Sequence, residues 1–257
     1  MSTALAELSP AHRDARSPAL WKKVRVLVRK DLRIEARARE TLPPMLAFAG
    51  TVTLLLAFAL PPNTSFTRPT RPLIGALAGA DVLAGFFWVT ILFAALIGFS
   101  RTFEVERSDG ALDPLLLAPI DRSGLYVAKA LVNLLYLLAV QALLVPAFGL
   151  LFAANLTGNP IVLFSVIGLA DIAIVAIGTL FAALAAQTRS RELMLPVLAL
   201  PVLVPAFIAA VELSADAFAG ASVSALAGRG WFGLLVAFDI IAVVIAALMF
   251  EFALEDA

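Results

Sequence analysis

Two carboxylates in this sequence stand inside long apolar stretches, where a titratable group could do chemistry. Asp171 lies in the middle of the apolar residues 160–186, and Asp239 lies within residues 231–252. A carboxylate at the centre of a bilayer costs about 2.5 to 3.5 kcal/mol on insertion scales, so it usually faces a polar interior. Two such groups could bind and release protons in a proton-coupled transporter, or they could hold helices together through hydrogen bonds.

At both carboxylates the sequence favours a protonated or hydrogen-bonded group that holds helices together. No Lys or Arg lies mid-span to pair with them, whereas Asn133, Gln141 and Thr179 are candidate hydrogen-bond partners. No combination of Ser, His and Asp, and no catalytic pair of carboxylates, falls on a common helical face. We therefore expect no catalytic residues, and a transporter subunit and not an enzyme.

Other kinds of site are excluded by residue type. The chain has a single histidine, His12, and no cysteine, which excludes disulfides, thiolate metal sites and a histidine-ligated haem or metal inside the membrane for this chain alone. It also lacks the G-x-x-x-x-G-K-[ST] loop that cradles nucleotide phosphates. If ATP drives this protein, the ATPase is another polypeptide. The first twenty residues lack an apolar core, so no cleavable signal peptide is expected.

A charged island, RTFEVERSDGALDPLLLAPIDRSGLYVAK at residues 101–129, interrupts the apolar chain. Asp109 and Gly110 form a turn signal, while Asp113 and Pro114 are typical of a helix N-cap followed by a first-turn proline. The pattern predicts two short helices joined by a tight bend. The island is interpreted as a rigid docking element for a cytoplasmic protein, with a solvated charged loop as the alternative.

The elements around the island are predicted to be membrane-spanning helices. The chain is 61% hydrophobic and 15% charged, with a mean hydropathy of +0.97, whereas soluble domains are about 45 to 50% apolar. A span needs about 20 apolar residues. Six segments meet or approach this length: 44–60, 81–99, 124–153, 160–186, 193–211 and 231–252.

Lysine and arginine counts orient these six spans. With both termini inside, the inner side has ten Lys or Arg before Thr41, four in the charged island and two at Arg189 and Arg191. The outer side has three, at Arg68, Arg71 and Arg229. Sixteen against three predicts cytoplasmic termini and a cytoplasmic island.

The segment before the first span carries a further prediction. In PALWKKVRVLVRKDLRIEARARE, at residues 18–40, apolar side chains share one face of a helix, which predicts an interfacial helix along the inner leaflet. That apolar face comprises Leu20, Trp21, Val24, Leu27, Val28 and Ile34. The helix could be a lever for a partner or a topology anchor, and the segment alone favours the anchor.

The last two predicted spans also carry a local signal each. Pro196, Pro201 and Pro205 predict kinks in the fifth span. The small-residue-rich residues 213–230, between the fifth and sixth spans, could form a re-entrant or surface helix or an ordinary outer loop.

Two strings in the chain also resemble a known family. The strings KDLRIEARARE and GFFWVTILFAALIGFSRTFEVERSDGALDPLLLAPIDRSGLYVAKALVNLLYLL, with the six-span layout, resemble the haem exporter protein B family, the membrane subunit of an ABC-type system for cytochrome c maturation. The resemblance implies an ABC-2-like permease fold whose loop between the second and third spans contacts an ATP-binding subunit. The residues that it places in this coupling region are Arg101, Phe103, Glu104, Glu106, Arg107, Gly110, Leu112, Leu116, Pro119, Arg122 and Lys129.

The resulting prediction is an all-α integral membrane protein of the inner membrane. Residues 1–19 are expected to be a disordered tail, and residues 20–257 a single six-helix permease domain with a coupling loop at 100–123. The predicted function is ATP-driven export of haem, or release of haem to a periplasmic chaperone. The expected partners are a cytoplasmic ATP-binding subunit, a haem-handling membrane subunit and membrane lipid, with no nucleic acid; haem is a candidate cargo, and no metal or cofactor is predicted for this chain.

Two alternatives to this function stay open. An ABC-2 permease for another cargo, such as a lipid, glycan or drug, would keep the charged island. A proton-coupled secondary transporter would depend on Asp171 or Asp239.

Overall fold

The computed structural model describes residues 20–59, 79–103, 122–152, 160–186, 191–218 and 221–253. Within these ranges the chain is helical and contains no strand. Six of the described helices are long and apolar enough to cross a membrane, which confirms the predicted all-α, multi-pass membrane protein. They are α2 (Leu42–Ala59), α3 (Gly79–Arg101), α6 (Arg122–Leu151), α7 (Pro160–Ala186), α8 (Arg191–Phe218) and α10 (Gly230–Ala253).

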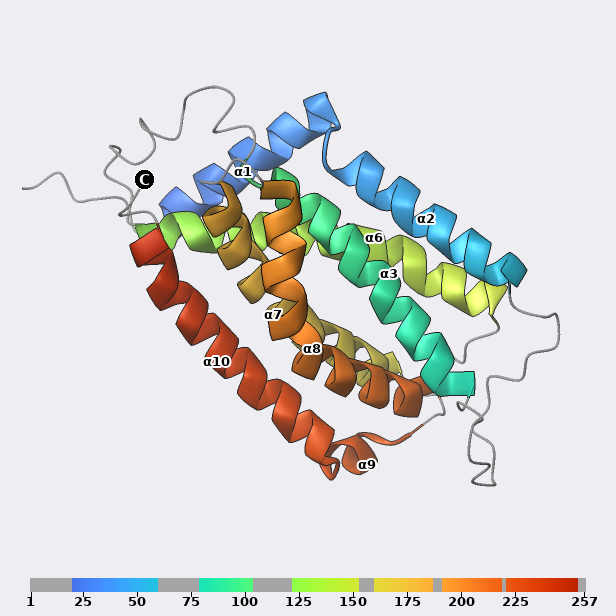
Figure 1. Ribbon diagram of the computed structural model, residues 1–257. Coiled ribbons are helices and arrows are strands. Elements are labelled where there is room, and N and C mark those ends of the chain that lie inside the picture. The colour runs from blue at the N-terminus through green and yellow to red at the C-terminus, as the bar shows by residue number, and fades with distance from the viewer. Residues whose placement is uncertain are drawn as a thin grey trace, which may run out of the picture.

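Two other described helices lie at opposite ends of the bundle. Helix α1 (Leu20–Ala38) crosses one end, where α3 and α10 finish and α6 begins (Figure 1). The five-residue helix α9 (Val223–Ala227) lies at the other end, just before α10 (Figure 1). The segment between the fifth and sixth spans therefore forms a short surface helix in its described part.

Helix α7 is the centre of the bundle. Its span is 67% buried, as is that of α3, against 17% for α2 and 22% for α10, so α2 and α10 lie at the periphery. Small residues allow the close packing: the ring of Phe99 in α3 lies where a Cβ on Gly178 of α7 would be. The centre is therefore enclosed by protein, while α2 and α10 are left to face lipid.

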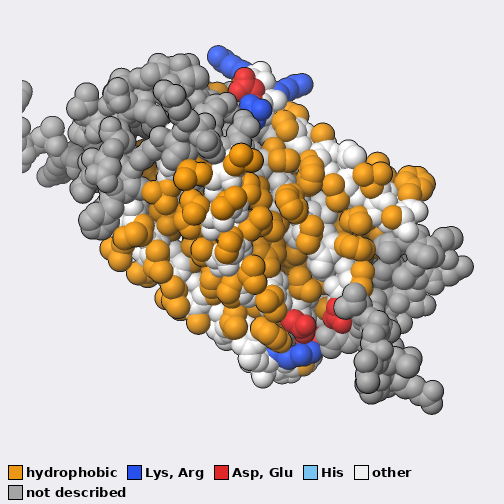
Figure 2. Space-filling model, viewed as in Figure 1, with side chains coloured by type: hydrophobic (Ala, Val, Ile, Leu, Met, Phe, Trp, Pro, Cys, Tyr) orange, Lys and Arg blue, Asp and Glu red, His pale blue; other side chains and the backbone are white. Residues whose placement is uncertain are grey.

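An apolar belt lies between two charged ends on the face that Figure 2 shows. Its large side chains are well exposed, for example Phe58 at 87% and Ile161 at 73%. A soluble protein rarely exposes so large a continuous apolar surface. The belt is the surface that the hydrocarbon of a bilayer would cover.

Helix α8 is bent, as its three internal prolines predict. Figure 1 shows its two halves running in different directions. The helix also continues past the predicted end at residue 211, because its polar side chains have partners: Trp88 Nε1 donates to Ser214 Oγ at 2.9 Å, and Arg229 pairs with Asp216 at 2.6 Å. A buried helix can continue through a less hydrophobic segment when the polar side chains of that segment are hydrogen-bonded or paired.

Candidate functional site

The structure describes both borders of the charged island but not its interior. Arg101 and Phe103 lie at the end of α3, and Lys129 lies in the second turn of α6. Arg122 begins α6, although its side chain is outside the described part of the chain. The remaining predicted coupling residues lie outside the described residues: Glu104, Glu106, Arg107, Gly110, Leu112, Leu116 and Pro119. The predicted pair of short helices falls there too.

Lys129 is a buried cation that joins three parts of the fold. It is 4% exposed, and its Nζ lies 3.0 Å from Asp31 Oδ2 of α1. The same Nζ donates a 3.1 Å hydrogen bond to the carbonyl oxygen of Thr102, just after α3, and lies 5.5 Å from the centre of the Phe103 ring. A buried ammonium group is tolerated only when it is paired and hydrogen-bonded, and here it is both.

The contacts continue from α6 into α7. Thr102 Oγ1 donates to Asn133 Oδ1 at 2.9 Å, and Asn133 Nδ2 donates to Thr179 Oγ1 at 2.9 Å. Asn133 follows Lys129 by four residues, which places both side chains on one face of α6. Asp31, Thr102, Lys129, Asn133 and Thr179 therefore form one connected set, here called the polar junction, which links α1, the end of α3, α6 and α7.

Glu35 fixes the turn between α1 and α2. Its two carboxylate oxygens each accept from Thr41 N at 3.1 Å, and Oε1 also accepts from Leu42 N at 2.7 Å. The next two residues of α2 are prolines, which have no N–H, so Glu35 takes up the free donors at the start of this helix. A carboxylate at a helix N-terminus also interacts favourably with the helix dipole.

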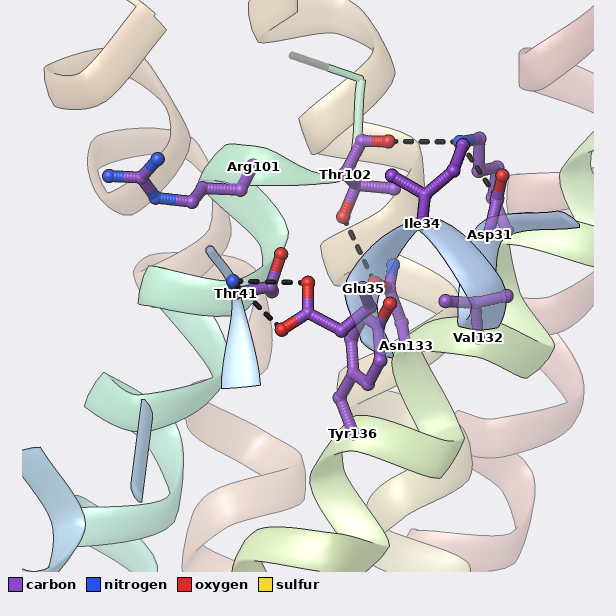
Figure 3. A pocket seen from close by; sticks show the side chains of 10 residues that line it. Asp31, Ile34, Glu35, Thr41, Arg101, Thr102, Val132, Asn133 and Tyr136 are labelled. Atoms are coloured by element: carbon purple, nitrogen blue, oxygen red, sulfur yellow. Dashed lines mark hydrogen bonds and ion pairs between the residues drawn. The ribbon is translucent and has the colours of Figure 1, made fainter. Parts of the chain in front are cut away.

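The junction borders a cavity of about 40 Å³. Figure 3 shows Thr102 and side chains of α1 and α6 facing one another around it, while Arg101 points away from them. Its lining comprises Asp31, Ile34, Glu35, Thr41, Arg101, Thr102, Lys129, Val132, Asn133 and Tyr136. Sites for small organic ligands are about 300 to 1,000 Å³. This cavity has room for water and not for haem or a nucleotide, so the junction is suited to a mechanical role.

Asp31 and Glu35 are functional candidates that were not predicted from the sequence. They follow the buried Val24 and Leu27 at helical spacing, so they lie on the face of α1 that packs against the bundle. Carboxylates on the apolar face of an amphipathic helix were the signal available in the sequence. Of the predicted apolar face, Val24 and Leu27 are buried, whereas Trp21 is 69% exposed.

The two intramembrane carboxylates differ in their surroundings. Asp171 is fully buried in α7, and its Oδ1 accepts a 2.6 Å hydrogen bond from Gln141 Nε2 of α6. Gln141 is one of the three partners that the sequence suggested; the other two, Asn133 and Thr179, bond to each other. Asp239 is buried in α10, and neither of its carboxylate oxygens has a hydrogen-bond partner within the described ranges.

Comparison with known proteins finds a family match and two relatives that each cover most of the chain. A family model described as CcmB protein matches residues 22–257. The heme exporter protein B of Rhodobacter capsulatus is 30% identical over 190 residues, which cover 74% of this chain and 81% of that protein. The heme exporter protein B of Bradyrhizobium diazoefficiens is 28% identical over 196 residues, covering 76% and 82% respectively.

Proposed function

The chain belongs to the CcmB protein family, and from this membership we propose that it is the membrane subunit of an ATP-driven haem exporter that serves cytochrome c maturation. Both relatives carry the name heme exporter protein B and match most of the chain. The immediate outcome of its cycle is movement of haem across the membrane or release of haem to a periplasmic chaperone. Hydrolysis of ATP belongs to a partner subunit, since the chain has no phosphate-binding loop.

The observation that carries the mechanism is the position of the polar junction at both borders of the charged island. Thr102 and Phe103 stand where the chain enters the island, and Lys129 is the last residue of the island. A partner that pushes on residues 101–123 therefore acts directly on the end of α3 and the start of α6. These are the two places that the junction ties together.

From there, three contacts carry the motion into the bundle. The pair between Lys129 and Asp31 passes it to α1, and the bond between Asn133 and Thr179 passes it to α7. Glu35 then couples α1 to the first turn of α2. Closure of an ATP-binding dimer would thus move α1 and α2 together with the island, and α7, the centre of the bundle, would move with α6.

The remaining partner is a haem-handling membrane subunit. Trp88 is fully buried and bonded to Ser214, so it serves packing, while Trp21 lies in α1 and Trp231 at the start of α10. The tryptophans do not gather into one aromatic surface. We assign the holding of haem to a separate subunit, and we place this chain in the inner membrane with both termini in the cytoplasm, on the strength of its basic-residue asymmetry.

Affinity purification from the native membrane in mild detergent, followed by mass spectrometry, tests this proposal. We expect an ATP-binding subunit and a tryptophan-rich membrane protein to remain bound. The double variant Glu104→Lys, Glu106→Lys should lose the ATP-binding subunit while still inserting into the membrane. Glu40→Lys, an exposed charge reversal outside the island, is the control and should retain it.

Each other outcome contradicts a stated part of the proposal. Absence of any ATPase after cross-linking would reject the ABC-type assignment. Recovery of an ATPase without a haem-handling protein would support the assignment as an ABC-type permease and contradict haem as its cargo. Full retention of the ATPase by the double variant would show that the ATPase does not depend on Glu104 and Glu106 of the island for binding.

A further inference from the structure

Helix α1 carries its two signs of charge on different faces. Asp31 and Glu35 are the acidic residues of this helix, and both are partly buried against the bundle. Asp31 is paired with Lys129, and Glu35 binds the backbone at the start of α2. The acidic groups are thus engaged by the protein itself and are not on the outward face.

The outward face of α1 is a basic stripe. It consists of five exposed cations: Lys22, Arg25, Arg29, Arg33 and Arg37. The four arginines repeat every four residues, so they follow one another along a single side of the helix. None of the five forms an ion pair with any residue that the structure describes. The positive charge of this stripe is therefore not neutralised by any part of the chain that the structure describes.

The apolar neighbours of the stripe indicate what that partner is. Trp21 and Val26 lie on the same outward side and are 69% and 67% exposed. Tryptophan is typical of the level of the lipid headgroups. Figure 1 shows α1 at the level where the spanning helices end, which is the level of the headgroups in a bilayer. A purely aqueous surface would not need the two apolar side chains.

We propose that this basic stripe binds the anionic phospholipid headgroups of the leaflet in which α1 lies. Guanidinium groups form paired hydrogen bonds with phosphate oxygens, and clusters of Lys and Arg beside a membrane bind anionic lipid. Trp21 and Val26 insert among the headgroups and hold the helix at that depth. Because α1 is tied to Lys129 and to α2, bound lipid sets the resting position of the same helix that the polar junction moves. The binding itself does not depend on the cargo or on the ATPase.

Trp21 can report this binding directly. The full-length chain, with Trp231→Phe, keeps Trp21 and the buried Trp88, which lipid cannot reach. It is reconstituted in mixed bilayers of phosphatidylcholine and phosphatidylglycerol, with bromine on one lipid or the other at equal mole fraction. We expect phosphatidylglycerol to be enriched near Trp21 by at least about fivefold, since even one cation near an anionic surface adds a factor of about five. Brominated phosphatidylglycerol should therefore quench Trp21 more strongly than brominated phosphatidylcholine. High salt should abolish the difference.

Two matched variants separate charge from structure. The triple variant Arg25→Gln, Arg29→Gln, Arg33→Gln keeps only two cations of the stripe and should lose most of the preference for brominated phosphatidylglycerol. The matched Arg→Lys triple variant should keep most of it. The salt series on the parent protein gives the same test if the glutamine variant fails to fold. Equal quenching by both lipids in the parent would overturn the proposal. A stripe that binds an acidic protein instead would give that result, together with loss of the ATP-binding subunit in the glutamine variant.

Discussion

Among single side chains, Lys129 is the one whose replacement we expect to lower stability most, because its ammonium group is buried and its partners come from separate segments. Lys129→Met would remove the charge and leave Asp31, whose side chain is 11% exposed, without its closest partner. Breaking one half of a buried ion pair costs about 3 to 5 kcal/mol. We expect a loss of about 3 kcal/mol in the free energy of unfolding, measured by chemical denaturation of the purified protein in detergent.

Lys30 offers a matched control for this substitution. Its Nζ lies 3.3 Å from the other oxygen of Asp31, but its side chain is 42% exposed. Pairs that water can reach contribute about 0 to 1 kcal/mol. Lys30→Met should therefore change stability by less than about 1 kcal/mol, and an equal loss in the two variants would show that burial does not govern the junction.

Asp171 separates the helix-holding interpretation from proton coupling. Asp171→Asn keeps a carbonyl oxygen for Gln141 Nε2, so we expect production of c-type cytochromes in cells to remain near the wild-type level. Gln141→Leu removes the donor that Asp171 Oδ1 accepts from and should cost about 1 to 3 kcal/mol of stability. Loss of function in a stably folded Asp171→Asn protein would support a carboxylate that exchanges protons during transport.

The turn between α1 and α2 depends on one carboxylate, that of Glu35. Glu35→Ala would leave the backbone N–H groups of Thr41 and Leu42 without an acceptor, and loss of a helix cap costs about 1 to 2 kcal/mol. We expect a stability loss of that size and faster hydrogen exchange at those two amides, measured by mass spectrometry.

Neighbouring substitutions show whether the effect belongs to the cap. Glu35→Gln keeps an oxygen acceptor and should recover part of the loss, whereas Glu40→Ala removes an exposed carboxylate from the same turn and should change little. If Glu40→Ala lowered stability as much as Glu35→Ala, general charge in the turn, and not the cap, would be responsible.

The helices themselves could largely be predicted from the sequence, because membrane spans depend on length and hydropathy, which are local properties. All six spans appear, with ends shifted where distant partners intervene. Thus α8 runs on to Phe218 because Ser214 meets Trp88 and Asp216 meets Arg229. The exposed position of Trp21 could not be predicted, since a helical face that packs on protein and one that lies on lipid have the same periodicity.

Pairings between side chains of distant segments could not be predicted from the sequence. Nothing local in α1 shows that Asp31 meets Lys129, or that Asn133 meets Thr179 and not a carboxylate. Only the Gln141 partner of Asp171 was among the predicted alternatives, because few polar side chains stand inside spans and the choice was small. The polar junction as a whole therefore required the assembled bundle, in which α1 crosses the end where α3 finishes and α6 begins (Figure 1).

The orientation of the whole molecule decides whether an ATPase could reach the junction. The chain has no cysteine, so a single introduced cysteine can be labelled without background. Ala38→Cys marks the exposed end of α1, and Ala227→Cys marks the exposed α9 at the opposite end of the bundle. In intact spheroplasts, a membrane-impermeant maleimide should label Ala227→Cys at once and Ala38→Cys only after permeabilisation, because sixteen of nineteen Lys and Arg residues fall on the proposed inner side. The reverse pattern would place the charged island and the polar junction outside, where no cytoplasmic ATPase could act on them, and would reject the coupling mechanism while leaving the family and the fold intact.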